Sequence, residues 1–183
     1  QIEEKPIYKL LSDTYSDDFG VYASGGSVSF SNDDIKKDIN DIFLCGFDSY
    51  KMRVGVKDWK EDKDRVKTAR NELGSNNLMV DAIQGTLNNW HKYNAVYNIK
   101  ELERYNLTWI EEPLHPSKLK ELKSVYDLIN IPIATGEGLS GKLDFDSYLD
   151  SKCVDIIQPD VTHCGGFMRT RKIIEQAKRK GIK

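Results

Sequence analysis

Short apolar runs alternate with helix-forming segments along most of the chain, and this order constrains the fold more than any other feature of the sequence. Strands are expected at residues 21–24, 49–55, 78–81, 107–111, 131–135 and 154–158, because these runs are short and rich in apolar residues. The intervening segments have apolar residues at helical spacing, and several end at glycine. A repeated strand-then-helix order predicts an α/β fold in which helices pack on a parallel sheet.

Three of the helices can be predicted in some detail. The first is expected to be capped by Asn32 or Asp33 and to end at Gly46, the second to span residues 60–73, and the last to end at Gly181. The apolar stripes that should face the sheet are Ile35, Ile39, Ile42 and Phe43 in the first helix, and Phe167, Ile173, Ile174 and Ala177 in the last. Such one-sided helices are typical of the outer layer of a sheet protein.

The number of strand–helix units favours part of a barrel. Six units are visible, whereas a closed (β/α)₈ barrel has eight strands and typically about 250 residues. We therefore expect a TIM-like (β/α) barrel that is incomplete at its C-terminus, formed by residues 21–183 and preceded by a linker or remnant at residues 1–20. The alternative is an open doubly wound sheet. That fold calls for a glycine-rich phosphate loop after the first strand, and residues 23–27 (ASGGS) match it poorly.

Three acidic residues stand at the ends of predicted strands. Asp81, Glu111 and Glu137 follow the apolar runs in LMVD, LTWIE and IPIATGE. In a parallel barrel the C-terminal strand ends surround one mouth, where carboxylates can converge on a hard divalent cation. Taken singly, each could instead be a helix cap or a solvated loop residue. Alternation along the strand allows only one of Glu111 and Glu112 to point into the mouth, and does not say which.

Composition narrows the class of partner. The chain has 183 residues, with 27 basic and 29 acidic side chains and a net charge of −2, and no long block of one sign favours nucleic acid or an anionic membrane. No apolar run approaches the roughly 20 residues of a membrane span. We expect a soluble, cytoplasmic protein that acts on a small molecule. We expect six residues to pack in the interior: Cys45, Cys153, Cys164, Trp59, Trp90 and Trp109. The three cysteines are expected to be reduced thiols.

Five motifs resemble those of one enzyme family. YKMRVG, LMVDAIQG, TWIEEPL, IPIATGEGLSG and VDIIQPDVTHCGG occur in the order and spacing seen in the mandelate racemase subgroup of the enolase superfamily. The resemblance covers the chain from about Ser49 to its end. Five motifs on consecutive strand ends are far more specific than any one of them.

The resemblance implies a set of site residues. Asp81, the first glutamate of the EEP motif (Glu111) and Glu137 would be ligands of Mg²⁺, and Asp160 would pair with a catalytic histidine. Lys51 matches the first lysine of the family's Lys-x-Lys motif. In such sites the cation acts on a carboxylate substrate as a Lewis acid, and a nearby ammonium offsets the charge of the enediolate formed when the α-proton leaves. Many relatives form homo-oligomers, and the same is implied for the full-length protein.

Two substitutions set this chain apart from the family pattern. Arg53 stands where the second lysine is often a base, and a guanidinium hardly ever accepts a proton at neutral pH. Removal of water from an acid sugar needs only one base, so Arg53 favours an aldonate or aldarate dehydratase over a two-base racemase. A cycloisomerase also remains open. Ile83 replaces a common asparagine, which removes one polar contact near the first metal ligand.

The catalytic histidine that the family pairs with Asp160 is expected beyond Lys183, and the family's N-terminal capping domain is not within residues 1–20. His91, His115 and His163 are expected to serve in loops or at the surface. We therefore expect the chain by itself to be inactive. A catalytically silent metal-binding fragment stays an alternative, as does an unrelated phosphate-binding barrel.

Overall fold

The computed structural model describes residues 2–12, 14, 16, 18–87, 90–140 and 144–183. Its described strands form one parallel sheet in chain order. They are β1 (Ala23–Ser24), β2 (Ser49–Arg53), β3 (Asn77–Asp81), β4 (Trp109–Glu111), β5 (Ile133–Thr135) and β6 (Ile156–Ile157). All six predicted strands are therefore present, although most are shorter than the apolar runs that predicted them.

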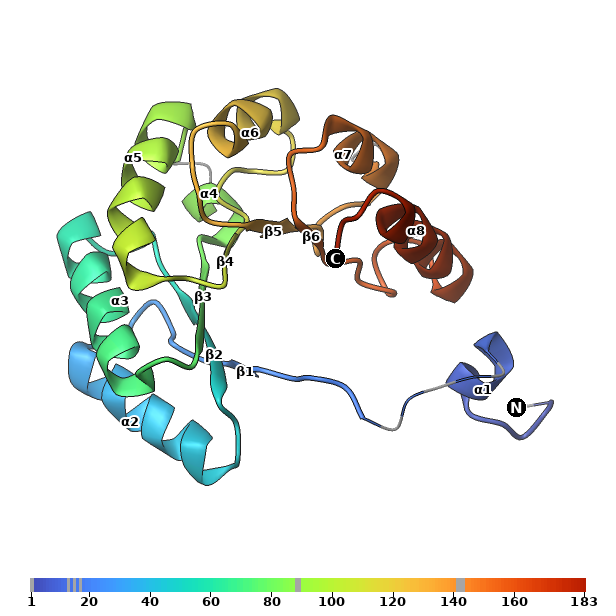
Figure 1. Cartoon of the computed structure of the whole chain (residues 1–183), viewed down its shortest axis with the longest axis horizontal. Helices are drawn as coiled ribbons and strands as arrows, with labels where there is room; N and C mark the ends of the chain where they lie inside the picture. The colour runs from blue at the N-terminus through green and yellow to red at the C-terminus, as the bar shows by residue number, and fades with distance from the viewer. Residues whose placement is uncertain (1, 13, 15, 17, 88–89, 141–143) are drawn as a thin grey trace.

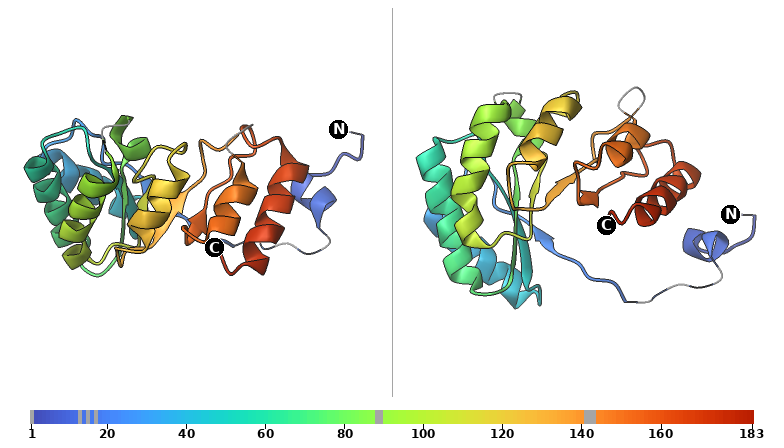
Figure 2. Two further views of the ribbon diagram at one scale, coloured as in Figure 1. Left: turned by 90° about the horizontal axis from the view of Figure 1, so that it is seen from above. Right: turned by 45° about the horizontal axis from the view of Figure 1, so that its top comes forward.

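Within the described ranges, six main helices lie along the outside of the curved sheet. They are α2 (Asn32–Leu44), α3 (Trp59–Leu73), α5 (Lys92–Leu102), α6 (Leu119–Tyr126), α7 (Phe145–Ser151) and α8 (Phe167–Arg179). Shorter helical segments are α1 (Ile7–Leu11), α4 (Ile83–Leu87) and the 3₁₀ turn η1 (Glu103–Tyr105). Figures 1 and 2 show the strands inside an open arc and the helices around it. This is the α/β arrangement of a partial (β/α) barrel.

Helix α2 begins with a reciprocal cap that the sequence analysis assigned to the wrong residue. The N-cap is Ser31 rather than Asn32 or Asp33. The Ser31 hydroxyl accepts a hydrogen bond from the backbone nitrogen of Asp34 (3.2 Å), and the Asp34 carboxylate accepts one from the backbone nitrogen of Ser31 (2.9 Å). Ser, Asn and Asp are similarly good caps by themselves, so the returned hydrogen bond from Asp34 favours Ser31.

The apolar stripes of two helices are narrower than predicted. Ile35 and Ile39 of α2 and Ile173 and Ala177 of α8 are buried as expected. In contrast, Phe167 and Ile174 are 48% and 41% exposed, and Phe43 is 38% exposed. Helix α8 packs mainly against α7, so only one side of α8 is covered. Apolar residues outside that line remain at the surface.

The two faces of the sheet differ in chemistry. Side chains that point toward the helices form the apolar core, and they include Tyr50, Met52, Leu78, Val80, Ile110, Ile133 and Ile157. The alternate positions face the inside of the arc. Arg53 is in register with Asp81, Asp81 with Glu111, and Glu111 with Ala134. The parallel register therefore places charged side chains from neighbouring strands in one layer at the C-terminal end of the sheet.

A buried ion pair on α3 fastens the loops after β1 and β2. The Arg65 guanidinium donates to the Asp62 carboxylate at 2.6 Å, and both side chains are almost fully buried. Arg65 also donates to the backbone carbonyls of Gly26, Ser27 and Arg53. Asp62 accepts a hydrogen bond from the backbone nitrogen of Gly55 at 2.6 Å. One salt bridge thus holds two loops that border the mouth of the arc.

The N-terminal segment contacts α8. It contains α1, and the carbonyl of Leu11 accepts a hydrogen bond from Arg171 on α8 (3.1 Å). In Figure 1 residues 18–22 extend from β1 along the open side of the arc, and α1 lies near α8. None of the helices in the described ranges is long and apolar enough to span a membrane.

The predicted interior residues differ in how far they are buried. Cys153 and Trp90 are buried, and Trp59 and Cys164 pack against the core while partly exposed. Cys45 is exposed instead of packed, because it caps the C-terminus of α2 beyond the buried stripe. All three cysteines are free, as predicted.

We predict that Asp62→Ala will lower the free energy of unfolding by about 3–5 kcal/mol, because it leaves the Arg65 guanidinium buried without its counter-charge. Urea denaturation monitored by circular dichroism measures this loss. The matched control is Asp127→Ala, which removes the carboxylate of an exposed ion pair with Lys123 and should cost less than about 1 kcal/mol. Equal losses for both variants would contradict a structural role for the buried pair.

Candidate active site

Four charged residues from β2, β3 and β4 meet at the C-terminal end of the sheet. The Lys51 ammonium lies 2.8 Å from Oε1 of Glu111 and 3.9 Å from Oδ2 of Asp81. The Arg53 guanidinium lies 3.8 Å from the same Asp81 oxygen, and its side chain remains 43% exposed. The structure therefore brings together four of the predicted site residues, with two cations facing two carboxylates.

The surroundings of Lys51 and Asp81 raise the pKa of both side chains. Burial acts to lower the pKa of Lys51, but the hydrogen bond to Glu111 and the charges of Glu111 and Asp81 outweigh it, so the pKa rises. The pKa of Asp81 is also raised, first by burial and then by the charge of Glu111. Lys51 in this setting is a fixed cation and not a proton acceptor.

Glu111 is held on both carboxylate oxygens. While Lys51 contacts Oε1, the other oxygen, Oε2, accepts hydrogen bonds from Nε2 of Gln158 (2.9 Å) and from Nε1 of Trp109 (3.3 Å). The Glu111 side chain is only 1% exposed. Glu111, and not Glu112, is thus the glutamate that faces Lys51 and Asp81.

Gln158 and Trp109 are site residues that the sequence analysis missed. Trp109 was expected only to pack, yet its indole nitrogen reaches Glu111 and its ring meets Tyr22 edge-on at 5.4 Å. Gln158 lies within the QPD motif but received no role. Alternation offered a signal, because Trp109 shares the inner face with Glu111, and Gln158 shares the face of Ile156.

Glu112 turns away from Lys51 into a second buried position. Its φ of +46° lies in the left-handed region that few non-glycine residues adopt. Oε2 accepts a hydrogen bond from the backbone nitrogen of Gln84 (3.2 Å), whereas Oε1 is buried with no partner among the described residues. Burial, followed by the charges of Glu137, Asp81 and Glu111, raises the pKa of Glu112 to about 7.

Glu137 and Asp160 are less closely joined to this group. Glu137 is exposed in the turn after β5, and its charge is felt at Glu112. Asp160 follows β6, where Oδ1 accepts hydrogen bonds from the hydroxyl (2.6 Å) and backbone nitrogen (2.7 Å) of Thr162. These bonds, the side-chain one first, lower the pKa of Asp160. The carboxylate of Asp160 thus closes a turn in this structure, and its predicted pairing with a histidine stays a prediction.

The three histidines lie outside the charged group. His91 precedes α5, His115 contacts the hydroxyl of Ser117 (2.8 Å), and His163 is exposed in the turn that follows β6. Their positions agree with the predicted loop or surface roles. Ile83 stands where the family commonly has an asparagine. Its backbone nitrogen donates a hydrogen bond to Oδ1 of Asp81 (2.8 Å). A main-chain donor thus contacts Asp81 from position 83.

The donor set suits a hard divalent cation in its chemistry. Carboxylate oxygens are the ligands that Mg²⁺ prefers, and the charges of Glu137, Asp81 and Glu111 add to burial in raising the pKa of Glu112. In the present arrangement the described residues include no group of three or more His, Cys, Asp or Glu placed to hold a metal ion. Lys51 occupies the side of Glu111 that faces Asp81, and Glu137 points to solvent. The predicted ligand trio stays a prediction.

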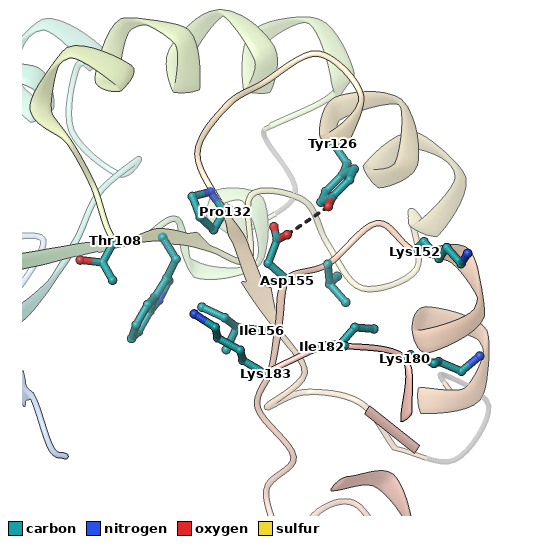
Figure 3. A pocket seen from close by; sticks show the side chains of 12 residues that line it. Thr108, Tyr126, Pro132, Lys152, Asp155, Ile156, Lys180, Ile182 and Lys183 are labelled. Carbon is teal, nitrogen blue, oxygen red and sulfur yellow. Dashed lines mark hydrogen bonds between the residues drawn. The ribbon is translucent and has the colours of Figure 1, made fainter. Parts of the chain in front are cut away.

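A cavity of about 520 Å³ lies at the opposite end of the sheet. Figure 3 shows that Thr108, Pro132 and Asp155, which precede β4, β5 and β6, contribute to its lining. Asp155 is engaged by Tyr126 (3.0 Å) and by the backbone nitrogen of Ile133 (2.8 Å). None of the four charged residues lines this cavity, whereas Trp109 lines it and also contacts Glu111.

Comparison with known proteins identifies the family. A family model described as enolase C-terminal domain-like matches residues 34–183. The D-gluconate/D-galactonate dehydratase of Picrophilus torridus is 31% identical over 180 residues, which cover 92% of this chain and 44% of that protein. Other relatives include further acid-sugar dehydratases, a cycloisomerase and a racemase.

Solved structures agree with this result. A racemase from Streptomyces coelicolor A3(2) with bound magnesium has a TM-score of 0.83 at 33% identity, over 88% of this chain and 44% of that one. L-Talarate dehydratase from Polaromonas sp. JS666, complexed with Mg and L-glucarate, has a TM-score of 0.84 at 30% identity, over 95% and 48%. The chain spans less than half the length of each of these proteins. It belongs to the mandelate racemase subgroup of the enolase superfamily and forms part of the C-terminal barrel domain of that family.

Proposed function

We propose that the complete protein is a Mg²⁺-dependent lyase that removes water from a sugar-derived carboxylic acid, such as an aldonate or aldarate. The observation that carries this proposal is the layer formed by Lys51, Arg53, Asp81 and Glu111 at the C-terminal strand ends. Relatives named as acid-sugar dehydratases support the reaction, and a dehydratase structure with Mg and L-glucarate supports the ligand class.

Asp81, Glu111 and Glu137 would hold the cation. When bound, Mg²⁺ would act as a Lewis acid toward the carboxylate of the substrate. Asp81 and Glu111 already share one layer, and Glu137 lies on the loop after the adjacent strand β5. Their three negative charges would exceed the two positive charges that Lys51 and Arg53 supply, which favours a cationic partner.

The chain's cations would bind and stabilise negative charge. Lys51, whose pKa is raised, would remain an ammonium beside the reacting carboxylate, where it offsets the charge that develops when the α-proton leaves. Arg53 is partly exposed at the mouth and would clamp an anionic group of the substrate. The proton acceptor would be the histidine that relatives pair with the position of Asp160. Because Arg53 cannot serve as a second base, chemistry that uses one base is favoured.

A catalytically silent metal-binding fragment is the alternative that a specific observation favours. The Asp160 carboxylate, which is expected to orient the histidine, accepts two hydrogen bonds from Thr162. A racemase or cycloisomerase of the same subgroup is distinguished from a dehydratase by its product.

The deciding experiment screens the full-length protein with Mg²⁺ against a panel of acid sugars. A keto-acid product supports the dehydratase, whereas isomerised substrate, a lactone or no turnover would exclude it.

Glu137→Gln should weaken Mg²⁺ binding by at least about tenfold in the full-length protein, because one anionic ligand becomes neutral. Isothermal titration calorimetry measures the dissociation constant. Glu72→Gln makes the same change on the exposed side of α3 and should leave the affinity unchanged. Equal affinity in wild type and Glu137→Gln would count against ligation by Glu137.

Arg53→Lys should introduce a second group that can exchange a proton. We expect solvent deuterium to enter the α-carbon from both faces of the substrate, while dehydration slows by about 10- to 100-fold because a lysine makes fewer hydrogen bonds to an anion. Proton NMR of recovered substrate in deuterium oxide provides the readout. Arg179→Lys, on the exposed end of α8, is the control. Exchange on one face only would show that residue 53 is not at the proton-transfer position.

A further inference from the structure

Gln158 has a position that the backbone fixes closely. It follows β6, and its backbone nitrogen donates to the carbonyl of Thr135 at 2.9 Å, which holds it beside the end of β5. Gly136 makes this approach feasible. A Cβ at residue 136 would come within 3.0 Å of the Gln158 nitrogen, and the φ of Gly136 is +133°, a region that side-chain-bearing residues rarely adopt.

The Gln158 side chain reaches across a whole strand. Its amide nitrogen lies 2.9 Å from Oε2 of Glu111 on β4, although β5 lies between β4 and β6. The residue of β5 in register with Glu111 is Ala134, which presents only a methyl group. A larger side chain at position 134 would fill the space that Gln158 crosses. The small side chain of Ala134 therefore leaves room for the long side chain of Gln158 to reach Glu111.

The amide is also oriented. A carboxylate accepts hydrogen bonds only, so Gln158 must present its nitrogen to Glu111. Its own oxygen, Oε1, is then buried with no partner among the described residues. An unpaired buried acceptor carries a desolvation cost that an apolar side chain of similar length would avoid. Packing alone therefore does not account for glutamine at this position.

The two oxygens of Glu111 thus have different neighbours. Oε2 is bound by the neutral donors of Gln158 and Trp109, and Oε1 faces the Lys51 ammonium on the side of Asp81. We propose that Gln158 is a positioning residue, which holds Oε2 so that Oε1 is kept for the cationic partners of the site. This inference rests on the proposed function and adds to it the residue that orients one of the expected Mg²⁺ ligands.

The functional test compares Gln158→Met and Gln158→Asn in the full-length protein. Methionine has a similar length but no donor, and asparagine keeps the amide but is one methylene too short. Both should weaken Mg²⁺ binding in calorimetry by about 10- to 100-fold, the loss typical of residues that orient a metal ligand. The Mg²⁺ concentration for half-maximal activity should rise in parallel. The matched control Gln176→Met, on α8, should behave as wild type.

Thermal unfolding separates positioning from stability. A shift of Tm in Gln158→Asn without a change in Mg²⁺ affinity would mean that Gln158 serves the fold only, and would overturn the inference. Wild-type affinity and activity in both variants would overturn it as well. If wild type binds Mg²⁺ but dehydrates none of the acid sugars, the proposed reaction fails while the affinity comparison still decides the role of Gln158.

A metal-free measurement keeps the inference decidable if wild type binds no Mg²⁺. The side-chain amide protons of Gln158 should exchange slowly with solvent in ¹⁵N NMR spectra of the full-length protein, and their chemical shifts should move in Glu111→Gln. The amide of Gln176 should not respond to that substitution. Rapid exchange of the Gln158 amide protons, or chemical shifts that stay the same in Glu111→Gln, would show that the two side chains do not interact.

Discussion

The ion pair between Lys51 and Glu111 is the interaction on which the rest of the site depends. It joins β2 to β4 across β3, and it brings Asp81 within 3.9 Å of the same ammonium. The register of the parallel strands makes this possible, because Arg53, Asp81, Glu111 and Ala134 occupy one layer. A shift of one residue along any strand would turn these side chains toward the apolar helices. Charge balance at the mouth therefore helps to specify the pairing of the strands.

The fold could be predicted from the sequence because its signals are local and repeated. Each of the six strands follows from a short apolar run, and α3 and α8 were expected close to their observed bounds. The errors arise where tertiary packing decides. Phe167 and Ile174 remain exposed because only one side of α8 meets α7, and Ser31 caps α2 because Asp34 returns the hydrogen bond. Neither partner can be recognised from the composition of the helix alone.

The site could be predicted only in part, for a related reason. Strand-end position was enough to expect Asp81 and Glu111 close together. Family resemblance chose Glu111 over Glu112 as a metal ligand, which stays a prediction, and the structure places Glu111 against Lys51. The contacts of Trp109 and Gln158 with Glu111 depend instead on which side chains cross the inside of the arc. Gln158 lies far from Glu111 in sequence, and its reach depends on the small size of Ala134. A contact that depends on three residues from three different strand regions has no signature in the local sequence.

The Arg65 guanidinium has a consequence for how the mouth moves. It binds carbonyl groups in the loop after β1 and at the end of β2, while Asp62 holds Gly55 in the loop after β2. These two loops are thus tied to one rigid helix, α3, and we expect them to fluctuate together. Amide exchange at Ser27 should then be correlated with exchange at Gly55.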